Sequence, residues 1–225
     1  MKARARSPNL GSKSRCEVGD QSGERCRTVA MAETRLDLPP YPSLDGDPES
    51  RLVMGMLHSV TQRGFADTRI IDVVTAAGMS KQTFYEYFES KEDCFLKAYE
   101  LHTKLNIARM RRVATPPGSW QEKTWRTTHT VVSDADAHPV IARAILQEVK
   151  AAGPKAARMR RAAAEDWAQL ISDIVAEASE RPPFEFCLMI SAAHDDYLAW
   201  LVASGDFDVE KETNVMWEFL VSALS

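Results

Sequence analysis

The chain has 225 residues, of which 44% are hydrophobic and 27% charged, a composition typical of one or two globular domains. This composition excludes collagen-like, disulfide-scaffold and wholly disordered proteins. No apolar run in the sequence approaches the roughly 20 residues that a membrane-spanning helix needs, and the N-terminus lacks the apolar core of a secretory signal. We therefore expect a cytoplasmic protein with no membrane contact.

The net charge is -4, so the charge of the whole chain does not indicate a nucleic-acid-binding protein. Any DNA binding must come from a local site. The cysteines are far apart and form no C-x-x-C pair, which excludes a local zinc finger or a thioredoxin-type redox site and favours a reducing compartment. They are Cys16, Cys26, Cys94 and Cys187.

Residues 1–45 are predicted to form a disordered basic extension. The first thirty residues carry seven Lys or Arg against three acidic residues and almost no large apolar side chains, so they cannot bury enough surface to become ordered. Residues 38–42 continue as a proline-rich linker. The basic excess could add non-specific attraction to phosphate, but composition favours an unstructured extension, with Met31 as a candidate initiator.

From Pro48 onward, apolar residues recur with helical spacing and strand-like alternation is nearly absent. The predicted fold is therefore all-α. The first helix begins at Pro48 and ends near Gly64. Its apolar stripe comprises Leu52, Val53, Met56, Leu57 and Val60.

Two short helices follow the first. One begins after Thr68, whose side chain we expect to cap it, and it buries four β-branched residues. The next begins at Ser80, also a favourable N-cap, and places Phe84 and Phe88 on one buried face. Between the two helices, Gly78 can adopt the positive φ that a tight turn requires. The four β-branched residues are Ile70, Ile71, Val73 and Val74.

The remaining helices are longer and are separated by proline and glycine signals. No internal repeat is present. The predicted helices cover residues 91–113, 119–135, 139–152, 154–180, 183–204 and 209–224.

The two short helices predict a helix-turn-helix. A short helix held by a packed partner can enter the major groove of DNA, which is roughly 12 Å wide, and present its first residues to base edges. Lys81, Gln82 and Thr83 occupy that leading position. Tyr85 and Tyr87 cannot share the core with the two phenylalanines, so their hydroxyls are placed to donate to phosphate.

The alternative for this segment is a helical hairpin used only for packing. Residues 48–95 hold five basic and seven acidic side chains, which lends this alternative some support. The paired aromatic residues and the glycine turn favour DNA binding instead.

The segment resembles the N-terminal domain of TetR-family transcriptional regulators, with the AcrR-like helix-turn-helix, whose signature runs from Gly-Phe through Ala-Gly-Val-Ser to Tyr-x-x-Phe and Lys. Residues 148–154 also resemble a segment of the effector domains of such regulators. The matching signature residues are Gly64, Phe65, Thr68, Ala77, Gly78, Met79 in place of valine, Ser80, Thr83, Tyr85, Phe88 and Lys91.

This resemblance implies a DNA-binding domain over residues 46–95 and a helical effector-binding and dimerisation domain over residues 96–225. It also implies roles for individual residues. Thr68, Arg69 and Lys91 would position the DNA backbone. Lys81, Gln82 and Thr83 would read bases, and Tyr85 and Tyr87 would anchor phosphates.

A single helix-turn-helix offers a small interface, so we expect a homodimer on a palindromic double-stranded DNA operator. The family resemblance implies that the last two helices of each copy form a four-helix bundle. The alternative is that these apolar stripes complete the core of one chain. The predicted interface residues are Leu198, Leu201, Met216, Phe219 and Leu220.

Bulky residues in the middle helices predict a pocket for a small hydrophobic effector. The alternative, that they fill the core, stays open. The predicted lining residues are Trp120, Trp125, His129, Ile145, Trp167 and Leu170.

We expect no cofactor, no metal and no enzymatic activity. Residues 134–138 straddle a predicted loop, and residues 194–196 lack partners at metal-ligand spacing. The sequence thus predicts a sequence-specific transcriptional regulator, specifically a repressor released by an effector, with the helix over residues 91–113 as the mechanical link. Two alternatives are an effector-independent regulator of the same fold and a helical-bundle metal-dependent enzyme.

Overall fold

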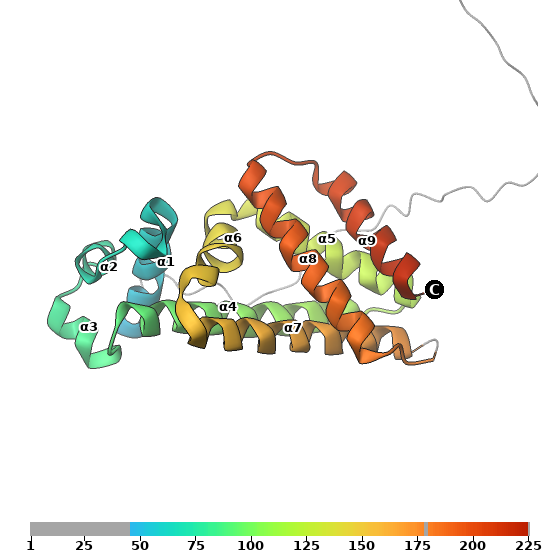
Figure 1. The fold of residues 1–225 in the computed structure, drawn as a ribbon, viewed down its shortest axis with the longest axis horizontal. Coiled ribbons are helices and arrows are strands. Elements are labelled where there is room, and N and C mark those ends of the chain that lie inside the picture. The colour runs from blue at the N-terminus through green and yellow to red at the C-terminus, as the bar shows by residue number, and fades with distance from the viewer. Residues whose placement is uncertain (1–45, 178–179, 225) are drawn as a thin grey trace, which may run out of the picture. The chain divides into compact units, whose positions relative to one another are not determined.

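The computed structural model describes residues 46–177 and 180–224; the predicted basic extension, with Cys16, Cys26 and Met31, lies outside them. The described residues form nine α-helices and one short 3-10 helix, and they contain no strand (Figure 1). The predicted all-α class is confirmed. The elements are α1 (Pro48–Asp67), α2 (Ile70–Ala77), α3 (Lys81–Tyr87), α4 (Lys91–Ala114), α5 (Trp120–Ala137), α6 (Pro139–Leu146), η1 (Glu148–Ala151), α7 (Gly153–Ala176), α8 (Phe184–Ser204) and α9 (Val209–Leu224).

The apolar stripe predicted for α1 is buried along its whole length. Asp47 caps the helix by accepting the amide of Ser50 at 3.1 Å. At Gly64 the backbone leaves the helical conformation, with φ 77° and ψ 160°, and helix resumes as far as Asp67. The predicted end of α1 is therefore a break inside it.

Two predictions for α2 are wrong. Thr68 does not cap this helix, because its hydroxyl turns back and donates to the carbonyl of Gly64 at 2.8 Å. Arg69 takes the N-cap position, and its amide donates to Asp72 Oδ2 at 3.0 Å. Ile71 is 43% exposed, since a helix of eight residues has one buried face and position 71 falls outside it.

The helix predicted over residues 139–152 is also wrong as one element. It stops at Leu146, and η1 follows after Gln147. Gln147 and Glu148 are both half-buried, and their side chains bond to Ala199 and Phe65 respectively. Hydrogen bonds to backbone groups far away in the sequence replace the regular helix at this point. The sequence gives no signal of the break, because no proline or glycine occurs there.

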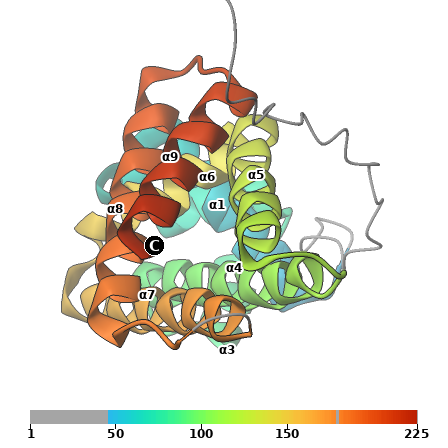
Figure 2. The ribbon, with the colours of Figure 1, turned by 90° about the vertical axis from the view of Figure 1, so that its right-hand side faces the viewer.

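The later helices pack around one another, with α7 beside both α4 and α8, and α9 beside α5 (Figures 1 and 2). One cluster of buried apolar side chains joins α1–α3 and the first turns of α4 to α6, η1 and α7. It therefore crosses the predicted domain boundary at residues 95 and 96. Two further clusters lie among α4–α9.

We predict losses of stability of very different size for substitutions at two neighbours on α3. Phe84 is fully buried, 5.7 Å from Phe88 between ring centroids, whereas Tyr85 is 58% exposed. Phe84→Ala should lower the free energy of unfolding by about 3–5 kcal/mol, and Tyr85→Ala by about 1 kcal/mol or less. Urea unfolding followed by circular dichroism measures both; equal losses would contradict the packing of α3 through Phe84.

Candidate functional site

Helix α3 begins at a well-formed cap. Ser80 Oγ accepts the amide of Thr83 at 3.0 Å, and Gly78 precedes it in the left-handed region with φ 65°. The helix has seven residues and is therefore about 10 Å long at the usual rise per residue. Its length and its isolated N-terminal turn suit the width of a major groove.

The predicted base-reading and phosphate-anchoring residues gather on the outer face of α3. Lys81 and Gln82 are exposed, and Tyr85 and Tyr87 are 58% and 46% exposed. Thr83 is half-buried, and its hydroxyl lies 3.0 Å from that of Ser80. Four of these side chains are therefore free to meet a partner, while Thr83 is partly engaged in the cap.

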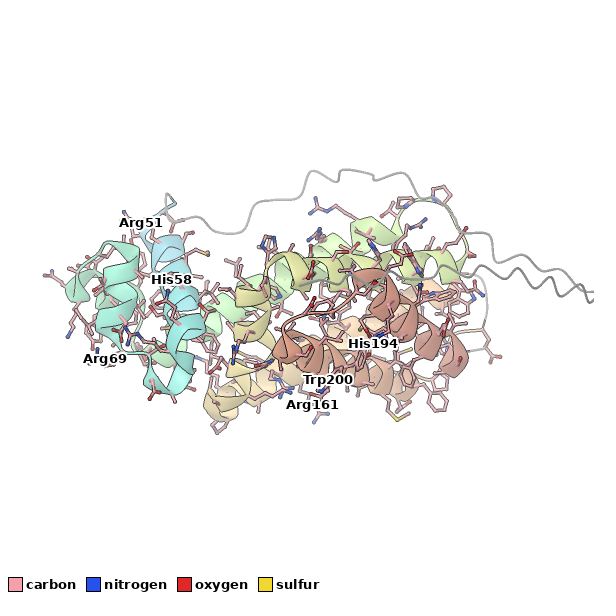
Figure 3. The ribbon with its side chains drawn as sticks, turned by 90° about the horizontal axis from the view of Figure 1, so that it is seen from above. Arg51, His58, Arg69, Arg161, His194 and Trp200 are labelled. Carbon is pink, nitrogen blue, oxygen red and sulfur yellow. The ribbon has the colours of Figure 1, made fainter. Side chains whose placement is uncertain are left out.

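Arg69 lies at the start of α2, the helix that precedes α3 (Figure 3). Its side chain is 72% exposed, and Nε lies 3.2 Å from Asp72 Oδ2. The hydrogen bond from the Arg69 guanidinium holds the pKa of the Asp72 carboxyl below its usual value. The carboxylate therefore stays charged and orients the arginine without burying it.

The two other predicted backbone-positioning residues lie beneath this surface. Thr68 is 1% exposed, so its side chain cannot reach a phosphate. Lys91 Nζ donates to the carbonyls of Phe65, Ala66 and Thr68 at 2.8, 2.9 and 2.8 Å, which uses all three N–H groups of the ammonium. It also lies 4.8 Å above the centroid of the Phe65 ring.

Sequence reasoning missed one supporting residue. Arg51 on α1 donates from Nη2 to the carbonyl of Ala77 at 2.8 Å, at the end of α2 where helix carbonyls lack partners. The same nitrogen lies 3.4 Å from the carbonyl of Gly78. No local pattern indicates this contact, because the two partners are 26 residues apart.

A cavity of about 410 Å³ lies among α4–α9. Two of the residues predicted to line a pocket, Ile145 and Trp167, line it. Most of its wall is apolar, with contributions from Val131, Ile171 and Leu198.

The polar groups of the cavity are mostly held in an uncharged or paired state. Burial lowers the pKa of His102 to about 4, so this imidazole is neutral at physiological pH. Burial also lowers the pKa of His194, which lies with Nε2 2.9 Å from the carbonyl of Met216. Burial raises the pKa of Asp195, which faces Arg160 at 3.4 Å.

The other predicted pocket residues lie elsewhere. Trp120 and Leu170 belong to a core cluster beside the cavity. Trp125 donates from Nε1 to Asn214 at 3.0 Å and stacks on His129, with ring centroids 4.9 Å apart. The prediction was wrong for these four because both rings on α5 turn toward α9 and the other two side chains fill the core.

The predicted interface on the last two helices needs a similar correction. Of its five residues, only Phe219 is exposed, at 50%; the others are buried within the chain, because α8 and α9 use those positions to cover the core. A different set of apolar residues faces solvent, including Trp200, which is 62% exposed (Figure 3). The four buried residues are Leu198, Leu201, Met216 and Leu220.

The structure offers no cluster of metal-ligating side chains within its described ranges, where no three His, Cys, Asp or Glu residues come together. Asp134 pairs with Arg109, and Asp196 pairs with Lys150 at 2.8 Å. Among these same residues, no helix has both the length and the apolar character to span a bilayer.

Comparison with known proteins finds relatives of the helix-turn-helix segment. A family model described as bacterial regulatory proteins of the tetR family matches residues 58–98, which run from the second half of α1 into α4. The chain is also 29% identical over 65 residues to the HTH-type transcriptional regulator YerO of Bacillus subtilis (strain 168). That match covers 29% of this chain and 22% of YerO, about a fifth of its length.

Solved structures resemble the chain over a longer stretch. FadR from Bacillus subtilis, in complex with stearoyl-CoA, has a TM-score of 0.69 at 17% identity and covers 77% of this chain and 97% of its own. FadR from Bacillus halodurans has a TM-score of 0.69 at 15% identity, covering 78% and 95%. A TetR-like transcriptional regulator from Rhodococcus sp. RHA1 has a TM-score of 0.64 at 17% identity, covering 79% and 95%.

The solved structures share the fold of the helices on both sides of residue 95, and the family model matches the helix-turn-helix itself. By these two findings together, residues 58–98 are similar to the helix-turn-helix of the tetR family of bacterial regulatory proteins, and the chain shares the fold of the solved regulators.

Proposed function

We propose that the chain is a sequence-specific DNA-binding transcriptional regulator that inserts α3 into the major groove. One observation carries this proposal: α3 buries Phe84 and Phe88 on one side and leaves Lys81, Gln82 and Tyr85 exposed on the other. A polar, aromatic face on a short helix at the surface has the chemistry of base and phosphate recognition.

The proposed roles follow from the groups that each side chain offers. Gln82 can bond adenine with both its amide atoms, and Lys81 can reach guanine or phosphate. Tyr85, Tyr87 and Arg69 would contact phosphate from the sides of α3. We leave Thr68 and Lys91 out of this set, because their side chains bond to the protein backbone.

We also propose that two copies bind a palindromic operator as a homodimer through the exposed apolar faces of α8 and α9. A solvent-exposed apolar strip at the end of a regulator needs a partner, and the strip occurs on two helices that contact each other. Two copies of this pair would form a four-helix bundle. The proposed interface comprises Phe186, Met189, Trp200, Val215 and Phe219.

The cavity supports a further proposal, that a small apolar or amphipathic effector releases the regulator from DNA as a repressor. An effector that binds a non-operator conformation more tightly would shift the population away from DNA. FadR from Bacillus subtilis, which shares the fold, was determined with stearoyl-CoA, so acyl chains are the first probes. The cavity favours this mechanism over an effector-independent regulator, and the proposal includes no catalytic step.

Two substitutions on α3 should separate base reading from phosphate binding. Gln82→Ala should relax the preference at one base position, at a cost of about 1–3 kcal/mol for the preferred base. Tyr85→Phe removes only a hydroxyl and should weaken binding to all sequences alike. Selection from a randomised duplex library, followed by affinity measurements at fixed salt, tests both; identical profiles for the two variants would contradict the assigned roles.

A charge in the exposed apolar strip should abolish the dimer. Trp200→Glu places a carboxylate in the proposed interface, where it would be buried without a partner, so sedimentation should give a monomer. The matched control is Val140→Glu, at a residue on α6 that is 54% exposed and outside the strip. A Trp200→Glu protein that stays dimeric would place the interface elsewhere.

Filling the cavity should abolish ligand binding. Ala164 lines the cavity, so Ala164→Phe should remove the thermal stabilisation that stearoyl-CoA or stearate gives the unaltered chain, about 2.7 kcal/mol at 100 times the Kd. Ala162→Phe, at an exposed position on the same helix, should keep it. If neither probe nor shorter acyl chains stabilise the unaltered chain, the result would support the effector-independent alternative.

A further inference from the structure

We propose that Gln147 and Glu148 form a strut between α8 and the end of α1, and that this strut positions the DNA-binding helices relative to α8. The inference rests on the proposed function, in which α8 belongs to the dimer interface and α3 reads DNA. A dimer on a palindrome must hold its two reading helices about 34–36 Å apart. Contacts that fix the DNA-binding helices against α8 therefore bear directly on affinity.

One end of the strut is the break in α1. Because Gly64 has φ 77°, the amide of Phe65 leaves the hydrogen-bonding pattern of the helix. This amide needs another acceptor, since a buried N–H without one is costly. Glu148 Oε2 accepts the amide of Phe65 at 2.8 Å, across 83 positions of sequence. The carboxylate lies against Gly64 itself, where a Cβ would come within 3.2 Å of it.

The other end is on α8. Gln147 Nε2 donates to the carbonyl of Ala199 at 2.8 Å, next to the exposed Trp200 of the proposed interface. A second tie runs from Lys150 Nζ to Asp196 Oδ1 at 2.8 Å, also on α8. Consecutive residues reach two different helices because the chain leaves α6 at Gln147 and tightens into η1.

Phe65 is also held through its carbonyl. Lys91 Nζ donates to the carbonyl of Phe65, so this residue has its N–H fixed from η1 and its C=O fixed from α4. The strut also begins close to the cavity, since Ile145 and Leu146 line it. Gln147 and Glu148 thus lie between three features: the proposed interface on α8, the cavity, and helices α2 and α3.

A double-mutant cycle on DNA affinity tests the strut without any effector. The duplex is the one that the unaltered full chain selects from a randomised library. Gln147→Ala and Glu148→Ala should each weaken its binding about fivefold to tenfold, and the double variant should bind within about twofold of the weaker single variant, because the two bonds act in series between α8 and α1. Glu148→Gln should bind within about twofold of the unaltered chain, since its amide oxygen can still accept the Phe65 N–H.

Controls separate positioning from stability. Glu100→Gln changes an exposed pair with Lys104 on α4 and should leave affinity unchanged. Melting temperatures are recorded for every variant. If Glu148→Ala does not fold, Glu148→Asp replaces it, because aspartate is one methylene shorter and withdraws the carboxylate from the Phe65 amide.

Each outcome has one meaning. Losses that multiply in the double variant would indicate two independent contacts and overturn the strut. Unchanged affinity in both single variants, with the unaltered chain binding its duplex, would also overturn the strut and leave the proposed function standing. If the unaltered chain selects no duplex at low salt, the proposed function fails, and the inference fails with it.

Discussion

The structure depends on how it satisfies the backbone groups released where α1 breaks at Gly64. A helix end leaves amides and carbonyls without partners, and each must be satisfied by another group or by water. Here the Lys91 ammonium donates hydrogen bonds to three backbone carbonyls, and the Glu148 carboxylate accepts one from a backbone amide. One ammonium and one carboxylate thereby fix the direction in which the chain enters α2, and with it the orientation of α3.

The local part of this arrangement can be read from the sequence. Ser80 and Gly78 predict where α3 begins, because an N-cap and a positive-φ glycine act on their immediate neighbours. Phe84 and Phe88 are predicted to be buried from their spacing alone, and the exposed tyrosines follow by elimination. Each of these features depends on residues within one or two helical turns, which is the range over which sequence spacing determines geometry.

The non-local part cannot be read in this way. The sequence shows that α5, α8 and α9 have apolar residues, but not which neighbour covers each of them. Trp125 turns to α9, Leu198 is covered inside the chain, and Trp200 is left in solvent. Likewise the spacing places Lys91 near a phosphate, while the fold supplies three closer carbonyls. Which partner a side chain meets is decided by packing between helices that lie far apart in the sequence.

The cavity and helices α1–α3 are not separated by an independent layer of side chains. Tyr99, Ile145 and Ala163 line the cavity and also belong to the apolar cluster that contains Phe84. Close-packed interiors do not deform smoothly; they change by the shift of whole elements between alternative arrangements. An occupant of the cavity would therefore press on the same packed cluster that holds α3, so any rearrangement that makes room for it has a direct mechanical path to the proposed DNA-binding surface.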